Sequence, residues 1–206
     1  MRGRLLLVGA LLLGLAACTA DVKAPTGAGA PTGPRCIERA SPAPPESSGP
    51  SAPSGGTGSG PVLPAMALPC FSGGRFTDVA DLGGQPTIVN LWASWCTPCR
   101  VELPTLAQFA ADGAGRVRVV GVVTRDRHDQ AQSVIDEMKL TFPMLEDQGQ
   151  QLAIAVSPLV SKALMSALPA TLFITPDGRI AYAYQGEPLT EARLKELTQQ
   201  YLGVSV

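Results

Sequence analysis

The stretch Trp92-Ala-Ser-Trp-Cys-Thr-Pro-Cys-Arg100 places two cysteines, Cys96 and Cys99, with two residues between them. It follows an apolar run at 87–91, typical of a buried strand, and precedes 101–110, where apolar residues recur at helical spacing. The cysteines are therefore expected at a helix N-terminus, where unpaired backbone N–H groups and the helix dipole stabilise an anion. A thiolate is such an anion, and it is the nucleophile in thiol–disulfide exchange.

A Cys-x-x-Cys pair is also compatible with half of a zinc site or with an inert disulfide. A zinc site needs two further ligands at suitable spacing. The only histidine is His128, which we expect at the protein surface or in a helix cap, and the other cysteines lie far upstream. A strand before the pair and a helix after it favour redox chemistry over both alternatives. We therefore expect neither a metal nor a cofactor.

The motif resembles the active site of the thioredoxin superfamily, and within it the membrane-anchored TlpA/ResA-like thiol–disulfide oxidoreductases. The resemblance runs from about residue 62 to the C-terminus. It implies a thioredoxin-like α/β fold, with a mixed central sheet flanked by helices. It also implies an N-terminal β-hairpin at 66–77 and the family insert around 141–149. Strands that alternate with helices along the chain are themselves typical of an α/β fold.

The resemblance also implies catalytic roles. Cys96, exposed at the helix N-terminus, attacks a substrate disulfide, and Cys99, one turn deeper, resolves the mixed disulfide. Asn90 stands where thioredoxins carry a buried aspartate, and an amide cannot accept the proton of the buried cysteine. Glu102 is the nearest carboxylate in sequence, so we expect it to assist proton movement at Cys99. A solvated surface position for Glu102 is the alternative.

Substrate contacts are expected on two segments. Leu168-Pro-Ala-Thr171 resembles the cis-proline loop that lies against the CxxC disulfide in the superfamily, although Ala170 stands where threonine is more usual. Trp95 is expected to shield the sulfurs, whereas Trp92 is expected in the core. The residues assigned to substrate binding are Trp95, Pro98, Leu168 and Pro169.

The N-terminus reads as an export signal. Residues 1–17 combine a basic start with an apolar run at 5–17 that is too short to span a bilayer. Leu15-Ala-Ala-Cys18 resembles the bacterial lipobox, which implies cleavage before Cys18 and a lipid on its sulfur. An ordinary signal peptide, cut nearby, is the alternative. In both cases we expect the mature protein outside the cytoplasm, in the first case anchored on the outer face of the cell membrane.

Residues 18–61 are rich in Ala, Gly, Pro and Ser and are expected to form a disordered tether, leaving 62–206 as the folded domain. The chain has five cysteines. If Cys18 is lipidated and Cys96 and Cys99 form the redox pair, Cys36 and Cys70 remain. An exported protein permits a structural disulfide between them. An unpaired Cys36, or pairing between molecules, is the alternative.

The resemblance favours an enzyme that reduces disulfides in exported proteins, with cytochrome c maturation as the best-known case, and that is recharged by a membrane thiol carrier. An oxidant that forms disulfides and a non-catalytic binding scaffold are the alternatives. A peroxidase of the peroxiredoxin group needs Thr or Ser three residues before its reactive cysteine, but Ala93 precedes Cys96 at that distance. The net charge of −1 gives no reason to expect nucleic acid. We expect a monomer.

Overall fold

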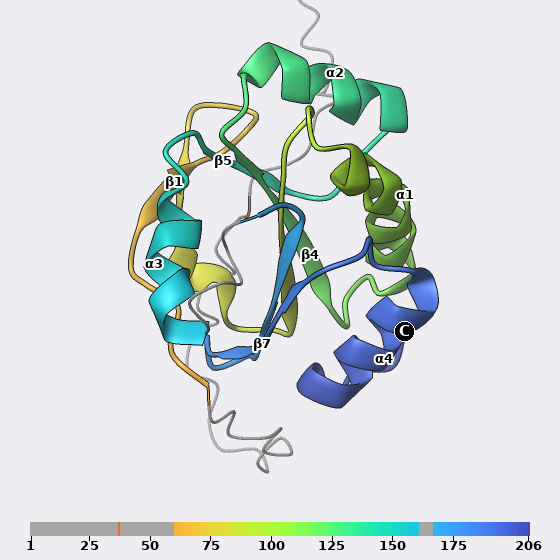
Figure 1. The fold of residues 1–206 in the computed structure, drawn as a ribbon. Helices are drawn as coiled ribbons and strands as arrows, with labels where there is room; N and C mark the ends of the chain where they lie inside the picture. Colours follow the sequence, from red (N-terminus) through yellow and green to blue (C-terminus); the bar gives the residue numbers. More distant parts are fainter. Residues whose placement is uncertain (1–36, 38–59, 161–166) are drawn as a thin grey trace, which may run out of the picture. The chain divides into compact units, whose positions relative to one another are not determined.

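A five-stranded mixed sheet forms the centre of the computed structural model, which describes residue 37 and the ranges 60–160 and 167–206. The strand order is β5-β4-β3-β6-β7 (Figure 1). Neighbours among the first three strands pair in parallel, and β6 and β7 join antiparallel. The strands are β3 (Thr87–Trp92), β4 (Arg118–Thr124), β5 (Met144–Asp147), β6 (Ala170–Ile174) and β7 (Ile180–Gln185). The predicted mixed central sheet is confirmed.

Helices cover both faces of the sheet, because the side chains of each strand alternate between the two faces. Ile88 and Trp92 of β3 join one core with three helices, whereas Val89 and Leu91 join a second core on the opposite face. Figure 1 shows α1 and α4 on one side of the sheet and α3 on the other. The helices are α1 (Thr97–Asp112), α2 (His128–Met138), α3 (Gln151–Val160) and α4 (Glu191–Leu202).

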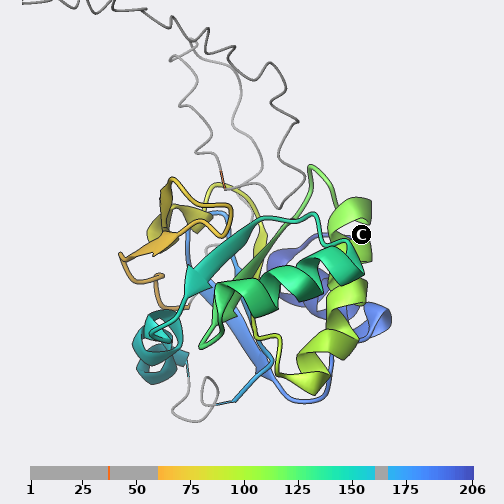
Figure 2. The ribbon, with the colours of Figure 1, turned by 90° about the horizontal axis from the view of Figure 1, so that it is seen from above.

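The predicted N-terminal hairpin is present as β1 (Ala67–Pro69) and β2 (Phe76–Asp78), which pair antiparallel. It lies beside the β5 edge of the central sheet, where Phe71 N donates to Met144 O at 3.0 Å (Figure 2). A short 3-10 helix, η1 (Val79–Leu82), follows the hairpin. Its N-terminus is capped by the Asp78 carboxylate, which accepts from Ala80 N at 3.0 Å. The hairpin and η1 help to close the second core.

Two prolines lie inside helices. Pro104 lies within α1. Pro158 lies within α3, which continues through it to Val160. Proline removes one backbone donor. Each proline therefore costs its helix one backbone bond, and the buried Leu152 and Val156 anchor α3 to the second core.

The N-terminal predictions fall largely outside the described residues. The signal peptide, Cys18, Cys36 and most of the tether lie there. Ile37 is half-buried and packs against the second core, although it belongs to the segment predicted as a disordered tether. At the domain boundary, Pro61 O already accepts from Ile180 N at 2.8 Å. Within the described ranges, no helix is both long and apolar enough to cross a membrane.

Candidate active site

Cys96 and Cys99 form a disulfide at the N-terminus of α1, with their Cα atoms 5.3 Å apart. Cys96 is the N-cap residue, and its Sγ accepts a hydrogen bond from Cys99 N at 3.2 Å. Pro98 lies in the first turn, where its missing N–H leaves no bond unmade. When the pair is reduced, the same backbone donor and the helix dipole can stabilise a thiolate on Cys96.

The oxidised pair is more deeply buried than expected. Cys99 is 0% exposed, as predicted for the deeper cysteine, but Cys96 is only 4% exposed. The prediction of an exposed Cys96 was therefore wrong for this state. Its sulfur is bonded to Cys99 and accepts from Cys99 N at the helix N-terminus. Cys96 is still the only one of the two that solvent reaches.

Glu102 lies in the core, with 1% of its surface exposed, so the solvated surface alternative is wrong. Its Oε1 accepts from Asn90 Nδ2 at 2.7 Å, and its Oε2 accepts from Leu189 N at 2.9 Å. Asn90 Nδ2 also donates to Thr171 Oγ1 at 3.0 Å. Burial raises the pKa of Glu102 above its usual value, and the donors from Leu189 and Asn90 oppose that shift in part.

Glu102 follows Cys99 by three positions on α1, so the two side chains are neighbours on one side of the helix. Both are buried against the sheet. The site therefore places a carboxylate with a raised pKa one turn below Cys99. A carboxylate with a raised pKa holds a proton more tightly than an ordinary one, so it can serve as a proton acceptor for a neighbouring thiol.

The Leu168–Pro169 peptide bond is cis, as the resemblance to the cis-proline loop predicted. The antiparallel pairing of β3 with β6 sets Leu91 opposite Ala170. One further step in that register brings Pro169 beside the end of β3, where the loop to Cys96 begins. Pro169 is buried, and Leu168 is half-buried against both cores, so only part of Leu168 is free to meet a substrate.

Exposed apolar groups flank the disulfide. Trp95, directly before Cys96, is 55% exposed, whereas Trp92 is fully buried, as expected for a core residue. Val101 is 63% exposed on α1, and Pro98 is also exposed. These side chains give the surface around Cys96 an apolar character that suits a polypeptide substrate.

Sequence reasoning missed two residues beside the site, Arg125 and Asp126. Asp126, which is 7% exposed, accepts hydrogen bonds from Ser94 N, from Ser94 Oγ at 2.9 Å and from Arg127 N at 2.8 Å. The carbonyl of Arg125 accepts from Trp95 Nε1 at 3.0 Å. The loop after β4 therefore fixes the loop before the cysteines. The sequence signal was available, because charged residues directly after a buried parallel strand lie at the edge where its neighbour also ends.

The remaining predicted residues lie apart from this chemistry. His128 stacks on Phe71 with ring centroids 4.3 Å apart and contacts the Glu146 carboxylate, which agrees with a surface position. Cys70 is disulfide-bonded. Since Cys36 lies outside the described residues, the Cys36–Cys70 pairing stays a prediction.

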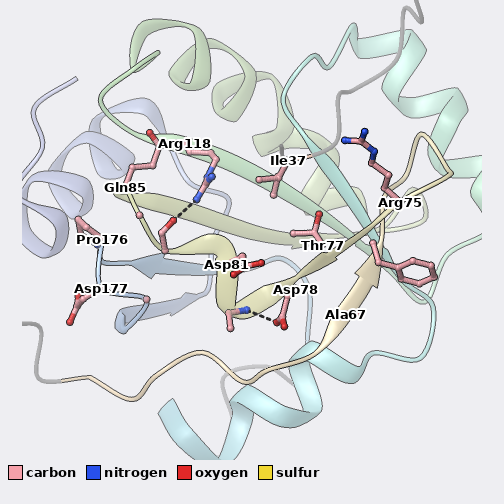
Figure 3. Close-up of a pocket in the computed structure, with 15 residues that line it drawn as sticks. Ile37, Ala67, Arg75, Thr77, Asp78, Asp81, Gln85, Arg118, Pro176 and Asp177 are labelled. Carbon is pink, nitrogen blue, oxygen red and sulfur yellow. Dashed lines mark hydrogen bonds between the residues drawn. The ribbon is translucent and has the colours of Figure 1, made fainter. Parts of the chain in front are cut away.

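A cleft of about 940 Å³ is lined by Gln85, just before β3, and by Arg118, at the start of β4 (Figure 3). The cysteines follow the other end of β3, so the cleft lies at the opposite end of the sheet. Arg118 donates to Leu82 O at 2.6 Å and to Gly83 O at 3.0 Å. Burial lowers the pKa of Arg118. Its guanidinium therefore joins β4 to the end of η1. Among the described residues, no group of three or more His, Cys, Asp or Glu is arranged to hold a metal.

Fold and site together define a thioredoxin-like thiol–disulfide oxidoreductase: a mixed sheet, a CxxC disulfide at a helix N-terminus and a cis-proline at the neighbouring strand. The chain belongs to the AhpC/TSA family, whose profile matches residues 60–183.

Curated relatives carry names of the same class. The thiol:disulfide interchange protein HelX of Rhodobacter capsulatus is 35% identical over 134 residues, covering 64% of this chain and 70% of the relative. The thiol-disulfide oxidoreductase ResA of Oceanobacillus iheyensis is 33% identical over 118 residues, covering 57% of each chain. The similarity therefore spans only part of each relative.

Solved structures agree with this class. A secreted disulfide oxidoreductase of Mycobacterium tuberculosis, described as homologous to DsbE of E. coli, superposes with a TM-score of 0.54 at 26% identity. That match covers 63% of this chain and 91% of the other. StoA of Bacillus subtilis gives a TM-score of 0.53 at 26% identity and covers 66% and 98% of the two chains.

Proposed function

We propose that the protein is an extracytoplasmic reductase of disulfides in exported proteins. The observation that carries the proposal is that α1 gives its two cysteines different surroundings. Cys96 Sγ accepts from the helix N-terminus, and Glu102 is buried one turn below Cys99. The first environment supports a nucleophilic thiolate on Cys96. The second provides a proton acceptor below the resolving cysteine.

The exchange proceeds in two displacements. The Cys96 thiolate attacks one sulfur of a substrate disulfide, forming a mixed disulfide and releasing the other substrate sulfur as a thiolate. Cys99 loses its proton to the Glu102 carboxylate, directly or through water, and attacks Cys96 Sγ. The second substrate thiolate leaves, and the Cys96–Cys99 bond forms again. Two electrons pass from the enzyme dithiol to the substrate disulfide. An external dithiol must then reduce the Cys96–Cys99 disulfide again.

The buried carboxylate supports the reducing direction. A negative charge on Glu102 disfavours a second negative charge on Cys99 nearby. An active site that destabilises its thiolate form releases electrons more readily, whereas strong oxidants stabilise their reduced form. Trp95, Pro98 and the exposed part of Leu168 would hold the substrate polypeptide against the cysteines, and the cis bond at Pro169 would set the course of that loop.

The proposed location outside the cytoplasm is argued from the N-terminal sequence. The signal-like residues 1–17 and the lipobox-like Cys18 favour export and a lipid anchor on the outer face of the membrane. A membrane thiol carrier would then recharge the enzyme, and cytochrome c maturation is one process that such a reductase serves. The likeness to a secreted M. tuberculosis oxidoreductase supports export.

The reduction potential of the Cys96/Cys99 pair tests the direction. We expect equilibration with dithiothreitol and glutathione buffers to give about −220 mV or lower, as for proteins that reduce disulfides. A reduction potential of about −120 mV would instead indicate an enzyme that forms disulfides. Reduction of insulin with dithiothreitol is the companion assay, because an intact pair without turnover would indicate a binding scaffold.

A further inference from the structure

Arg125 and Trp95 form a cationic platform beside Cys96. The Arg125 guanidinium carbon lies 5.4 Å from the centroid of the Trp95 ring, within the range of a cation–π contact. Trp95 directly precedes Cys96, and its indole N–H donates to Arg125 O at 3.0 Å. Side chain and main chain of Arg125 therefore both contact the same tryptophan.

The platform is held in place by its surroundings. Arg125 has a left-handed backbone with φ of 50°, which few non-glycine residues adopt. Its N–H donates to Asp147 O at 3.3 Å, and the next residue, Asp126, binds Ser94 of the cysteine loop. The parallel pairing that sets Trp92 opposite Val123 brings these two loops together. The position of the cation is thus built into the fold.

The charge of Arg125 has no counter-ion among the described residues. The nearby acids are engaged elsewhere: Asp129 with Arg127, Glu137 with Arg100, and Glu146 with His128. The Asp126 carboxylate accepts from Ser94 and Arg127 N. The Asp147 carboxylate caps α3 through Gln151 N and Leu152 N. An exposed, unpaired guanidinium therefore stands next to the nucleophile.

We propose that Arg125 is a specificity-determining residue that favours substrates with a carboxylate side chain next to the cysteine under attack. The inference rests on the proposed function, since it concerns which disulfide the enzyme reduces. An acidic residue that flanks the target cysteine would meet the guanidinium while the adjoining backbone lies over Trp95. A carboxylate pairs well with a guanidinium, which offers several donors in a fixed plane. A lysine at the same place would be repelled.

Matched peptides test the proposal. Each peptide carries one cysteine as a mixed disulfide with the same small thiol, flanked by Glu, Gln or Lys. The rate constant for reduction by the reduced enzyme is divided by that for dithiothreitol, which removes the effect of the flanking charge on the peptide's own reactivity. We expect the normalised rate to be about fivefold higher for the Glu than for the Lys peptide at about 0.01 M salt. The preference should vanish at about 1 M salt, where charges are screened.

Variants assign the effect to Arg125. Arg125→Gln should lower the Glu-to-Lys ratio to about one, Arg125→Glu should invert it, and Arg125→Lys should retain most of it. The matched control is Arg75→Gln, because Arg75 is an exposed arginine on the rim of the distant cleft (Figure 3). It should leave the ratio unchanged.

Two results would overturn the inference: equal normalised rates for the Glu and Lys peptides with the unmodified enzyme, or a preference that survives in Arg125→Gln. Failure to reduce any of the peptides would count against the proposed reductase itself. Turnover of all the peptides without a charge preference would remove only the role of Arg125.

Discussion

Asn90 Nδ2 donates to Glu102 Oε1 at 2.7 Å, beneath the redox-active disulfide. The amide is fully buried and the carboxylate nearly so. An amide at this position can hold a charged carboxylate through a hydrogen bond, whereas a second carboxylate would repel it. The identity of residue 90 therefore influences, together with the donor from Leu189 N, how readily Glu102 ionises in the core.

Glu102→Gln should slow thiol–disulfide exchange by about 100-fold, the low end of the range for a positioned acid or base. The loss follows because the amide cannot take the proton of Cys99. The rate of the reduced enzyme with a peptide disulfide, measured against pH, should show one titration less than the unmodified enzyme. An unchanged pH profile would show that Glu102 has only a structural role.

The same variant should change how stability depends on pH. The pKa of Glu102 in the folded protein is raised above 4.5, so the folded state binds this proton more tightly than the unfolded state. The contribution of Glu102 to stability therefore falls as pH rises from about 4.5 through the raised pKa. Urea unfolding should show that the unmodified protein loses stability relative to Glu102→Gln across this window. A difference that is constant with pH would contradict the burial effect.

Asn90→Asp should destabilise the protein by about 3 kcal/mol at pH 7, because two buried carboxylates would then contact each other. The loss should diminish in acid, where the pair keeps a proton. Thr171→Val is the uncharged control. It removes the other acceptor of Asn90 Nδ2 and should cost about 1 kcal/mol at every pH. Equal stability of Asn90→Asp and the unmodified protein at pH 7 would show that Glu102 is already neutral there.

Asp126→Asn should destabilise the protein by about 1–2 kcal/mol, because the amide cannot accept all the hydrogen bonds from Ser94 and Arg127 N. Ser94→Ala is the matched control, since it removes only the hydroxyl bond and should cost about half as much. Urea unfolding measures both. If the two variants were equally stable, the bond from Ser94 N would contribute nothing to the loop.

The predicted Cys36–Cys70 bridge can be tested by peptide mapping of the mature protein without reduction. We expect a cross-linked peptide that persists when mild reductant opens Cys96–Cys99, because structural disulfides have lower potentials than catalytic ones. Closing a loop of this length would stabilise the protein by about 3–4 kcal/mol. Alkylation of Cys36 in the folded, unreduced protein would exclude the bridge.

Local patterns predicted much of the fold and of the site. The strand, the cysteine motif and the following helix appear where apolar spacing placed them, and the cis bond at Pro169 lies in the segment that resembled the cis-proline loop. The acceptor role of Thr190 at the start of α4 follows the same local logic, since its side chain accepts from Arg193 N at 3.3 Å.

Contacts between distant segments could not be predicted in this way. The buried Glu102 carboxylate accepts from the backbone N–H of Leu189, which lies 87 residues later in the chain. Asp126 reaches Ser94 only because β3 and β4 pair in parallel and end at the same edge. Cys96 likewise belongs to a core cluster with residues of distant strands and helices, which no local pattern records.

The central claim is that Cys96 attacks the substrate and Cys99 resolves the mixed disulfide. Trapping with single cysteine variants and substrate disulfides tests it most directly, with the covalent complexes resolved on non-reducing gels. Cys99→Ser should accumulate mixed disulfides through Cys96, and Cys96→Ser should accumulate none, because Cys99 is wholly buried. Equal trapping by both variants, or trapping by Cys96→Ser alone, would contradict the account.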